Sequence, residues 1–482
     1  MKPGGIAQSA GLMAGAQLLA KLVDILTLLV LARVLMPGDF GLVALASAVL
    51  LSLAAVTEVP LTEALIQRRT AAEADLSAAF TLSLLRGLLA AALLTALAAP
   101  LARLFGEPRL GAVLTTFALI PLAQGCASPA MVHALRALDY RALACSQLCG
   151  KLAACGVMLS VALAGGGVGA LVAGLVAGPL VTALSTHLLA PWRLRLSLRG
   201  AAGLFHFAGW VSLSRMIFTL NQQSDRFFIG AILGRPQLGL YTMAGDLASL
   251  ATHSLAAPAA QPLFAGFAAL RDAPARLRES YLRAQQILLC LIAPTGLLFA
   301  VFAADLVPLV LGAGWSAMVP LIWWLAPVIA LQAVTLPAQA LLMALGKPKS
   351  LVFRESLSLA LRLPATLLAA LFLGLTGAAA ARSLAALVMI AVMLRLGGTE
   401  IGLSAGEQLR RSGRIFCALA LMMAGVVPAA LAWSAPETTA GALLRLSALC
   451  GLGLLIYGLS LFLLHRHSGR AEGVADLIRR IR

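Results

Sequence analysis

Polar side chains recur at helical spacing in two neighbouring apolar segments near the middle of the chain. Each segment carries its set at positions i, i+4, i+7 and i+11: Arg215, Thr219, Gln222 and Arg226, then Thr242, Asp246, Ser249 and His253. This spacing places each set along one side of a helix. Because a charged side chain at the bilayer centre costs about 3 kcal/mol or more, we expect both sets to face protein or a water-filled cavity. Cations on such a face could bind phosphate groups, and a carboxylate with a histidine could move protons.

The same pattern occurs near the start of the chain. The segment from Ala32 to Leu45 aligns with the segment from Gly230 to Met243, and this alignment places Gly41 on Gly239. It also places three further polar residues, Gln17, Lys21 and Asp24, on Arg215, Thr219 and Gln222, so the polar set is repeated with different charges. Two halves that face each other across a polar space are typical of transporters.

The composition indicates a protein that crosses a membrane many times. The 482 residues are 61% hydrophobic and 11% charged, whereas a soluble domain is about half apolar and about a quarter charged. A bilayer core needs roughly 20 apolar residues for each helix that crosses it. We count fourteen such runs: Gly11–Leu35, Phe40–Ile66, Ala78–Leu104, Leu110–His133, Leu143–Leu163, Val168–Leu189, His206–Leu233, Leu238–Phe264, Ala284–Leu311, Ala317–Leu345, Leu351–Leu373, Ala378–Leu396, Ile415–Trp433 and Ala442–Leu464.

The charges of the connecting loops predict the orientation of the chain. Basic residues gather in alternate loops and in the tail from Arg466 to Arg482, and the other loops and span ends hold only Arg103, Arg109, Arg235 and Arg445. Because basic loops stay in the cytoplasm, we expect both termini there. This asymmetry accounts for the net charge of +17 without a nucleic-acid partner, and it favours the anionic headgroups of membrane lipids.

The repeat predicts two six-helix lobes, residues 1–196 and 206–396, joined by a cytoplasmic linker at residues 197–205. A cytoplasmic loop, two further helices and a basic tail follow over residues 397–482. Six helices preserve the orientation of the chain, so the lobes are expected to be parallel repeats. The seven cysteines lie inside apolar runs with no metal-ligand pattern, and no phosphate-binding loop for ATP is present. We therefore expect no metal and no bound cofactor.

Three blocks of sequence carry a resemblance to a known family: LARVLMPGDFGLVALA, then EALIQRRTAAEADLSAAFTLSLLRG, then SDRFFIGAILGRPQLGLYTMAGDLAS. They resemble the Wzx-like polysaccharide flippases of the multidrug/oligosaccharidyl-lipid/polysaccharide superfamily, and within it the colanic-acid exporter branch. The resemblance implies two lobes around a central cavity, alternating access, and an undecaprenyl-diphosphate-linked oligosaccharide as substrate. It implies movement of that substrate to the periplasmic leaflet of a bacterial inner membrane, with no enzymatic activity. Contacts with other polysaccharide-assembly proteins and coupling to a proton or sodium gradient are further expectations.

The residues expected to line the substrate cavity come from both lobes: Gln17, Lys21, Asp24, Lys151, Arg215, Thr219, Gln222, Asp246 and His253. Lys21 and Arg215 are candidates for binding the diphosphate, and the alternative for Lys21 is an ion pair with Asp24. Lys151 either lines the cavity or pairs internally, and Arg226 either lines it or pairs with Asp225. Asp246 and His253 either couple proton movement to transport or form satisfied polar contacts.

Glu58 and Glu63, at the end of the second span, are a candidate gate with the Arg68-Arg69 loop, and the alternative is a solvated helix end. The other cations inside apolar runs are Arg86, Arg362 and Arg382.

Two other functions stay open at this point. A cation-coupled multidrug exporter would share the two-lobe organisation. A membrane-embedded glycosyltransferase or polymerase would normally carry a large outer loop with acidic residues, but the outer loops here are short, such as Met36 to Asp39 and Gly234 to Gln237. Their shortness weighs against an enzyme.

Overall fold

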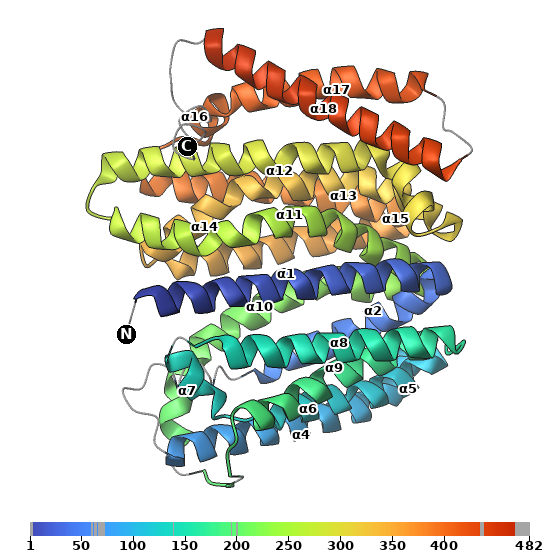
Figure 1. Cartoon of the computed structure of the whole chain (residues 1–482), viewed down its shortest axis with the longest axis vertical. Coiled ribbons are helices and arrows are strands. Elements are labelled where there is room, and N and C mark those ends of the chain that lie inside the picture. The colour runs from blue at the N-terminus through green and yellow to red at the C-terminus, as the bar shows by residue number, and fades with distance from the viewer. Residues whose placement is uncertain are drawn as a thin grey trace. The chain divides into compact units, whose positions relative to one another are not determined.

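The computed structural model describes residues 3–58, 61, 65, 73–137, 139–193, 195–198, 201–433 and 438–467, and across these ranges the regular secondary structure is helical (Figure 1). The chain divides into two compact units, Met1–Gly239 and Leu240–Arg482. The prediction of an all-α fold is thereby confirmed.

The first unit is built from long helices with shorter ones between them: α1 (Pro3–Val34), α2 (Pro37–Thr57), α4 (Glu73–Leu104), α5 (Pro108–Phe117), α6 (Leu119–Gly125), α7 (Met131–Arg136), α8 (Arg141–Leu163), α9 (Val168–Leu189), α10 (Ala201–Leu233) and the start of α11 (Arg235–Ala269). α8 packs on α9 and on α1, α4 packs on α5 and α6, and α10 packs on α2. These contacts position the polar residues of α1 against α8.

The second unit holds the rest of α11 and the following elements: α12 (Pro274–Val310), η1 (Ala313–Met318), α13 (Val319–Leu331), η2 (Gln332–Thr335), α14 (Leu336–Ala344), α15 (Pro348–Glu400), α16 (Ala405–Arg411), α17 (Gly413–Ala432) and α18 (Thr439–His467). α12 contacts α13, α17 and α18, and α15 packs on α13 and α14. Buried apolar side chains such as Phe302 on α12 and Met422 on α17 form the core between these helices.

Ten segments among the described residues are long and apolar enough to cross a membrane. The chain is therefore a multi-pass membrane protein. Each of the fourteen stretches predicted from hydropathy contains helix, while the number of crossings, fourteen, stays a prediction.

The fourth predicted span, Leu110–His133, is not one continuous helix, because the structure divides it into α5, α6 and α7. Proline has no backbone N–H and cannot donate to the carbonyl four residues earlier. The carbonyls that lose this bond to Pro121 and Pro129 belong to Phe117 and Gly125, which are the last residues of α5 and α6. Proline placement thus explains both breaks.

The predicted spans Leu351–Leu373 and Ala378–Leu396 both lie within α15, which is 53 residues long. Gly374 interrupts it with φ 68° and ψ −155°, a conformation that a residue without a Cβ adopts readily. The two predicted spans therefore stand on either side of a turn at Gly374.

The predicted lobe boundary at residues 197–205 differs from the border of the compact units between Gly239 and Leu240. α10, the first helix of the predicted second lobe, packs on α2 and α4 inside the first unit. A contact border reports packing, whereas the lobes were inferred from a sequence repeat, so the lobe boundaries stay a prediction.

Candidate functional site

The clearest polar cluster joins α1 to α8 inside the first unit. The Lys151 ammonium donates to both carboxylate oxygens of Asp24, each at 2.8 Å. The two side chains are 46% and 51% exposed, although both lie in segments long and apolar enough to span a membrane. Because charged side chains are costly against lipid, this position agrees with the polar path expected from the sequence, and that path stays a prediction.

Lys21 lies one turn before Asp24 on α1 and is partly buried, and Gln17 one turn further back is exposed. The ion pair considered between Lys21 and Asp24 is not formed, because Asp24 instead pairs with Lys151 of α8. Within the part of the chain that the structure describes, Lys21 has no ion pair. The cluster of Lys21, Asp24 and Lys151 therefore keeps a net positive charge.

A second contact holds α1 and α8 in register one turn further along. The Thr27 hydroxyl lies 2.9 Å from the Cys155 sulfur, and it also donates to the carbonyl of Val23 at 2.7 Å. Thr27 is 6% exposed. The buried Thr27–Cys155 contact and the accessible Asp24–Lys151 pair thus fix one edge of α1 against α8.

The structure describes three of the four polar side chains of the set on α10. Thr219 is partly buried, Gln222 is exposed, and Arg226 and Asp225 both have interaction partners. Arg215 lies in α10, but its side chain lies outside the described residues. Its role as a diphosphate ligand therefore stays a prediction.

The remaining predicted cavity residues belong to the second unit. Asp246 on α11 is exposed and has an interaction partner, and the side chain of His253 lies outside the described residues. Arg382 of α15 donates to the Tyr241 hydroxyl at 3.2 Å, and its guanidinium carbon lies 5.5 Å from the centre of the Tyr241 ring. One cavity that joins the polar sets of both units stays a prediction.

Of the two glutamates predicted to form a gate at the end of the second span, the structure describes one. Glu58 is partly buried directly after α2, and Glu63 lies outside the described residues. Among the residues that the structure describes, no group of three or more His, Cys, Asp or Glu side chains could hold a metal ion.

A close contact that sequence reasoning did not predict brings together the first residues of α2 and α11. A methyl group on Gly41 would overlap the carbonyl of Arg235, and one on Gly239 would overlap the carbonyl of Pro37. The Arg235 guanidinium forms an ion pair with Glu107, N to O 3.2 Å, directly before α5. The repeat had placed Gly41 on Gly239 in the alignment, which was the one signal in the sequence for this contact.

The sequence signature of one family, described as "Polysaccharide biosynthesis protein", matches residues 30–320, which is more than half of the chain. The chain is 28% identical over 305 residues to the succinoglycan biosynthesis transport protein ExoT of Rhizobium meliloti, covering 62% of this chain and 61% of that protein. It is 28% identical over 151 residues to the lipopolysaccharide biosynthesis protein WzxC of Escherichia coli, covering 31% of each. The matches thus span less than two thirds of the length of either relative.

Two solved structures show the same fold. The lipid II flippase MurJ in an inward closed conformation superposes with a TM-score of 0.75 and 11% identity, covering 95% of this chain and 100% of that one. An inward-facing multidrug-resistance transporter of the MATE family superposes with a TM-score of 0.63 and 14% identity, covering 80% and 94%. At these identities the likeness establishes the fold alone. With its sequence signature over residues 30–320, the chain belongs to the polysaccharide biosynthesis protein family.

Proposed function

We propose that this protein is a flippase that moves undecaprenyl-diphosphate-linked oligosaccharides from the cytoplasmic to the periplasmic leaflet for surface polysaccharide synthesis. Family membership supports this proposal, as do the names of the two relatives, which refer to succinoglycan transport and lipopolysaccharide biosynthesis. We place the protein in a bacterial inner membrane with both termini in the cytoplasm, because the basic loops and tail gather on that side.

The observation that carries the proposal is the accessible charge cluster of α1 and α8. A diphosphate presents several anionic oxygens, and lysine ammonium groups bind phosphate through charge and hydrogen bonds. Lys21 has no ion-pair partner among the described residues and can receive such an anion directly. Lys151 is held by Asp24 at 2.8 Å, so it can exchange this carboxylate for a phosphate oxygen when substrate enters.

Asp24 has a defined part in this scheme. In the empty cavity it orients the Lys151 side chain and offsets part of the cost of holding an ammonium group inside the membrane. Once the diphosphate binds Lys151, the Asp24 carboxylate lies beside a second anion. The resulting repulsion weakens binding and helps the substrate to leave the cluster.

A flippase that works by alternating access also needs an outer end that can close. We assign this role to the contact between α2 and α11. The segments Pro37–Gly41 and Arg235–Gly239 lie against each other at the ends of helices that the loop charges assign to the periplasmic side. Backbones that meet without intervening side chains leave no path for a sugar. We therefore assign this contact to the closed outer end, which separates during alternating access.

A cation-coupled multidrug exporter is the second candidate, because a MATE-family transporter shares the fold with a TM-score of 0.63. Family membership and both named relatives favour the flippase. In a strain that lacks the protein, loss of surface polysaccharide with unchanged drug susceptibility supports the flippase. Raised drug susceptibility with intact polysaccharide supports the exporter.

The decisive test is complementation of that strain with variants of the charge cluster. We expect Lys21→Ala to restore little surface polysaccharide and Lys21→Arg to restore more, because arginine keeps the charge. Lys349→Ala is the matched control, since Lys349 is an exposed lysine outside the cluster. Full restoration by Lys21→Ala and by Lys151→Ala, at normal protein levels, would remove the basis for assigning the diphosphate to this cluster.

A further inference from the structure

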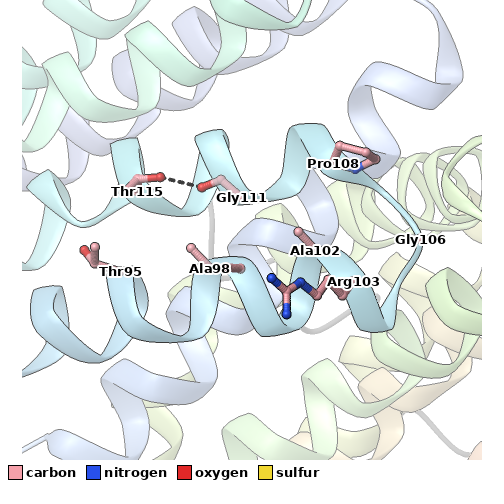
Figure 2. A pocket seen from close by; sticks show the side chains of 9 residues that line it. Thr95, Ala98, Ala102, Arg103, Gly106, Pro108, Gly111 and Thr115 are labelled. Carbon is pink, nitrogen blue, oxygen red and sulfur yellow. Dashed lines mark hydrogen bonds between the residues drawn. The ribbon is translucent and has the colours of Figure 1, made fainter.

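A groove lies between α4 and α5. Its volume is about 570 Å³, within the roughly 300–1,000 Å³ typical of ligand sites. Along α4 it is lined by Thr95, Ala98, Ala99, Ala102 and Arg103, and along α5 by Pro108, Gly111 and Thr115, with Gly106 in the connecting turn (Figure 2). Apart from Arg103, the residues that line the groove are small, and they leave the space between the two helices open.

The walls of the groove are apolar even where threonines line them. Thr115 donates its hydroxyl hydrogen to the carbonyl of Gly111, and Thr95 donates to the carbonyl of Ala91 at 2.9 Å. Each hydroxyl is thereby satisfied within its own helix and requires no polar ligand. The groove therefore suits a hydrocarbon chain along most of its length.

One end of the groove differs, because Arg103 lies there, close to the turn at Gly106 (Figure 2). The loop charges assign this end to the periplasmic side, where the sequence places few cations. Two of those few cations are neutralised: Arg235 pairs with Glu107 at 3.2 Å, and Arg445 pairs with Asp305 at 2.7 Å. Arg103 is exposed and has no ion pair among the described residues. The first turn of α5, at Pro108, adds positive helix-dipole charge at the same end.

We propose that this groove binds an anionic glycerophospholipid of the outer leaflet, with an acyl chain between α4 and α5 and the phosphate on Arg103. A phospholipid matches the charge better than an isoprenoid diphosphate, because a single guanidinium faces the groove and a diphosphate would leave excess negative charge. The site lies outside the charge cluster of α1 and α8, so it does not depend on the transport activity proposed above.

The test is native mass spectrometry of the full chain in detergent, with phosphatidylglycerol or phosphatidylcholine added in equal amounts. We expect the protein to retain phosphatidylglycerol in preference. Arg103→Gln should weaken that preference roughly fivefold, as expected for one cation at an anionic headgroup. Arg109→Gln is the matched control, since Arg109 is also an exposed outer cation but does not line the groove.

A second variant tests the acyl-chain end of the site. Ala99 lines the groove and is exposed, so Ala99→Phe fills the space without disturbing the packed interior. We expect Ala99→Phe to reduce retention of both lipids, and unchanged elution and helical content would show that the variant is folded. Equal effects of Arg103→Gln and Arg109→Gln, or retention unaffected by Ala99→Phe, would overturn the site. Displacement of phosphatidylglycerol by an equal amount of undecaprenyl phosphate would overturn the choice of a glycerophospholipid.

Discussion

Gly41 and Gly239 lie against each other where α2 and α11 begin, and a Cβ on either one would overlap a carbonyl of the opposite segment, that of Arg235 or of Pro37. A methyl group on Gly41 would lie 2.9 Å from the backbone nitrogen of Gly239, and one on Gly239 would lie 3.0 Å from that of Gly41. The same two residues align with each other in the sequence repeat. The contact is therefore reciprocal, as expected where two equivalent segments meet around a local axis.

Replacing either glycine by alanine should separate these backbones. Since the added methyl group meets main-chain atoms rather than a flexible side chain, we expect a cost of about 1–3 kcal/mol, as for overpacked cores. The expected results of Gly41→Ala or Gly239→Ala are a less stable outer contact and reduced surface polysaccharide. Gly38→Ala is the control, because a methyl group there would lie 3.7 Å from the side chain of Pro236, an ordinary contact.

Opening of this contact can be measured directly with a thiol reporter. A cysteine in place of Gly38 would lie under Pro236 and Arg235, so it should react slowly with a membrane-impermeant maleimide once the native cysteines are replaced. Adding Gly239→Ala should speed the reaction. An unchanged labelling rate would mean that this contact does not close the outer end.

The ion pair between Arg235 and Glu107 should contribute to the same closure. Its atoms are 3.2 Å apart, and the side chains are 35% and 20% exposed. Partly exposed pairs contribute up to about 1 kcal/mol, which corresponds to roughly a fivefold change in an equilibrium constant. We expect Arg235→Gln and Glu107→Gln each to speed labelling of the reporter cysteine by no more than about fivefold.

Exchanging the charges of Arg235 and Glu107 tests whether the ion pair itself slows the labelling. The double variant Arg235→Glu with Glu107→Arg restores an opposite-charge pair and should return the labelling rate towards that of the parent. If the exchanged variant labels as fast as Arg235→Glu alone, the arginine acts through its packing over Gly38 and not through its charge.

Much of the fold follows from hydropathy, because a membrane permits helices of a narrow range of lengths. The exceptions have local causes that are present in the sequence, but the count of apolar runs did not take them into account. Pro121 and Pro129 divide the predicted span Leu110–His133 into three helices, since each removes one backbone hydrogen bond at a helix end. Proline in a membrane helix is often tolerated, as Pro100 is within α4, so proline alone does not locate a break.

The candidate site was harder to predict, because periodicity reports which residues share a helix face and not which helix covers that face. Lys21 and Asp24 were correctly placed on one side of α1, but the partner of Asp24 is Lys151, 127 positions away. The pairing depends on the register of α1 against α8, which the Thr27–Cys155 contact helps to fix. A single sequence carries no signal for that register.

The Asp24–Lys151 pair makes a prediction about stability that is separate from transport. With side chains about half exposed, the pair itself should contribute about 0.2–1 kcal/mol. Lys151→Met leaves the Asp24 carboxylate without its partner inside a membrane segment, so this variant should unfold at a lower temperature than the parent protein. Asp24→Asn with Lys151→Met removes both charges and should recover most of that loss.

The single variant Lys151→Met and the double variant also show whether the charges of this cluster serve folding or transport. If the double variant folds as well as the parent protein but fails to restore surface polysaccharide, the charges serve the substrate. Restored polysaccharide in the double variant would show that the pair serves packing alone, and it would leave Lys21 as the one cation of the cluster assigned to the diphosphate.

The strongest stability effect is expected at Arg445, which ties α18 to both α12 and α17. Its guanidinium donates to Asp305 at 2.7 Å and to the carbonyl of Ala430 at 2.6 Å, and the two side chains of the pair are 8% and 22% exposed. Removing one partner of a buried pair costs about 3–5 kcal/mol, because the other charge is left uncompensated. Arg445→Leu should therefore lower the thermal unfolding midpoint in detergent far more than Arg414→Leu, which removes an exposed arginine of α17.

Asp305→Asn added to Arg445→Leu should recover part of the loss, since no charge then stays buried. Should Arg445→Leu unfold at the same temperature as the parent protein, the hairpin of α17 and α18 would be held by its apolar contacts with Phe302 and its neighbours alone.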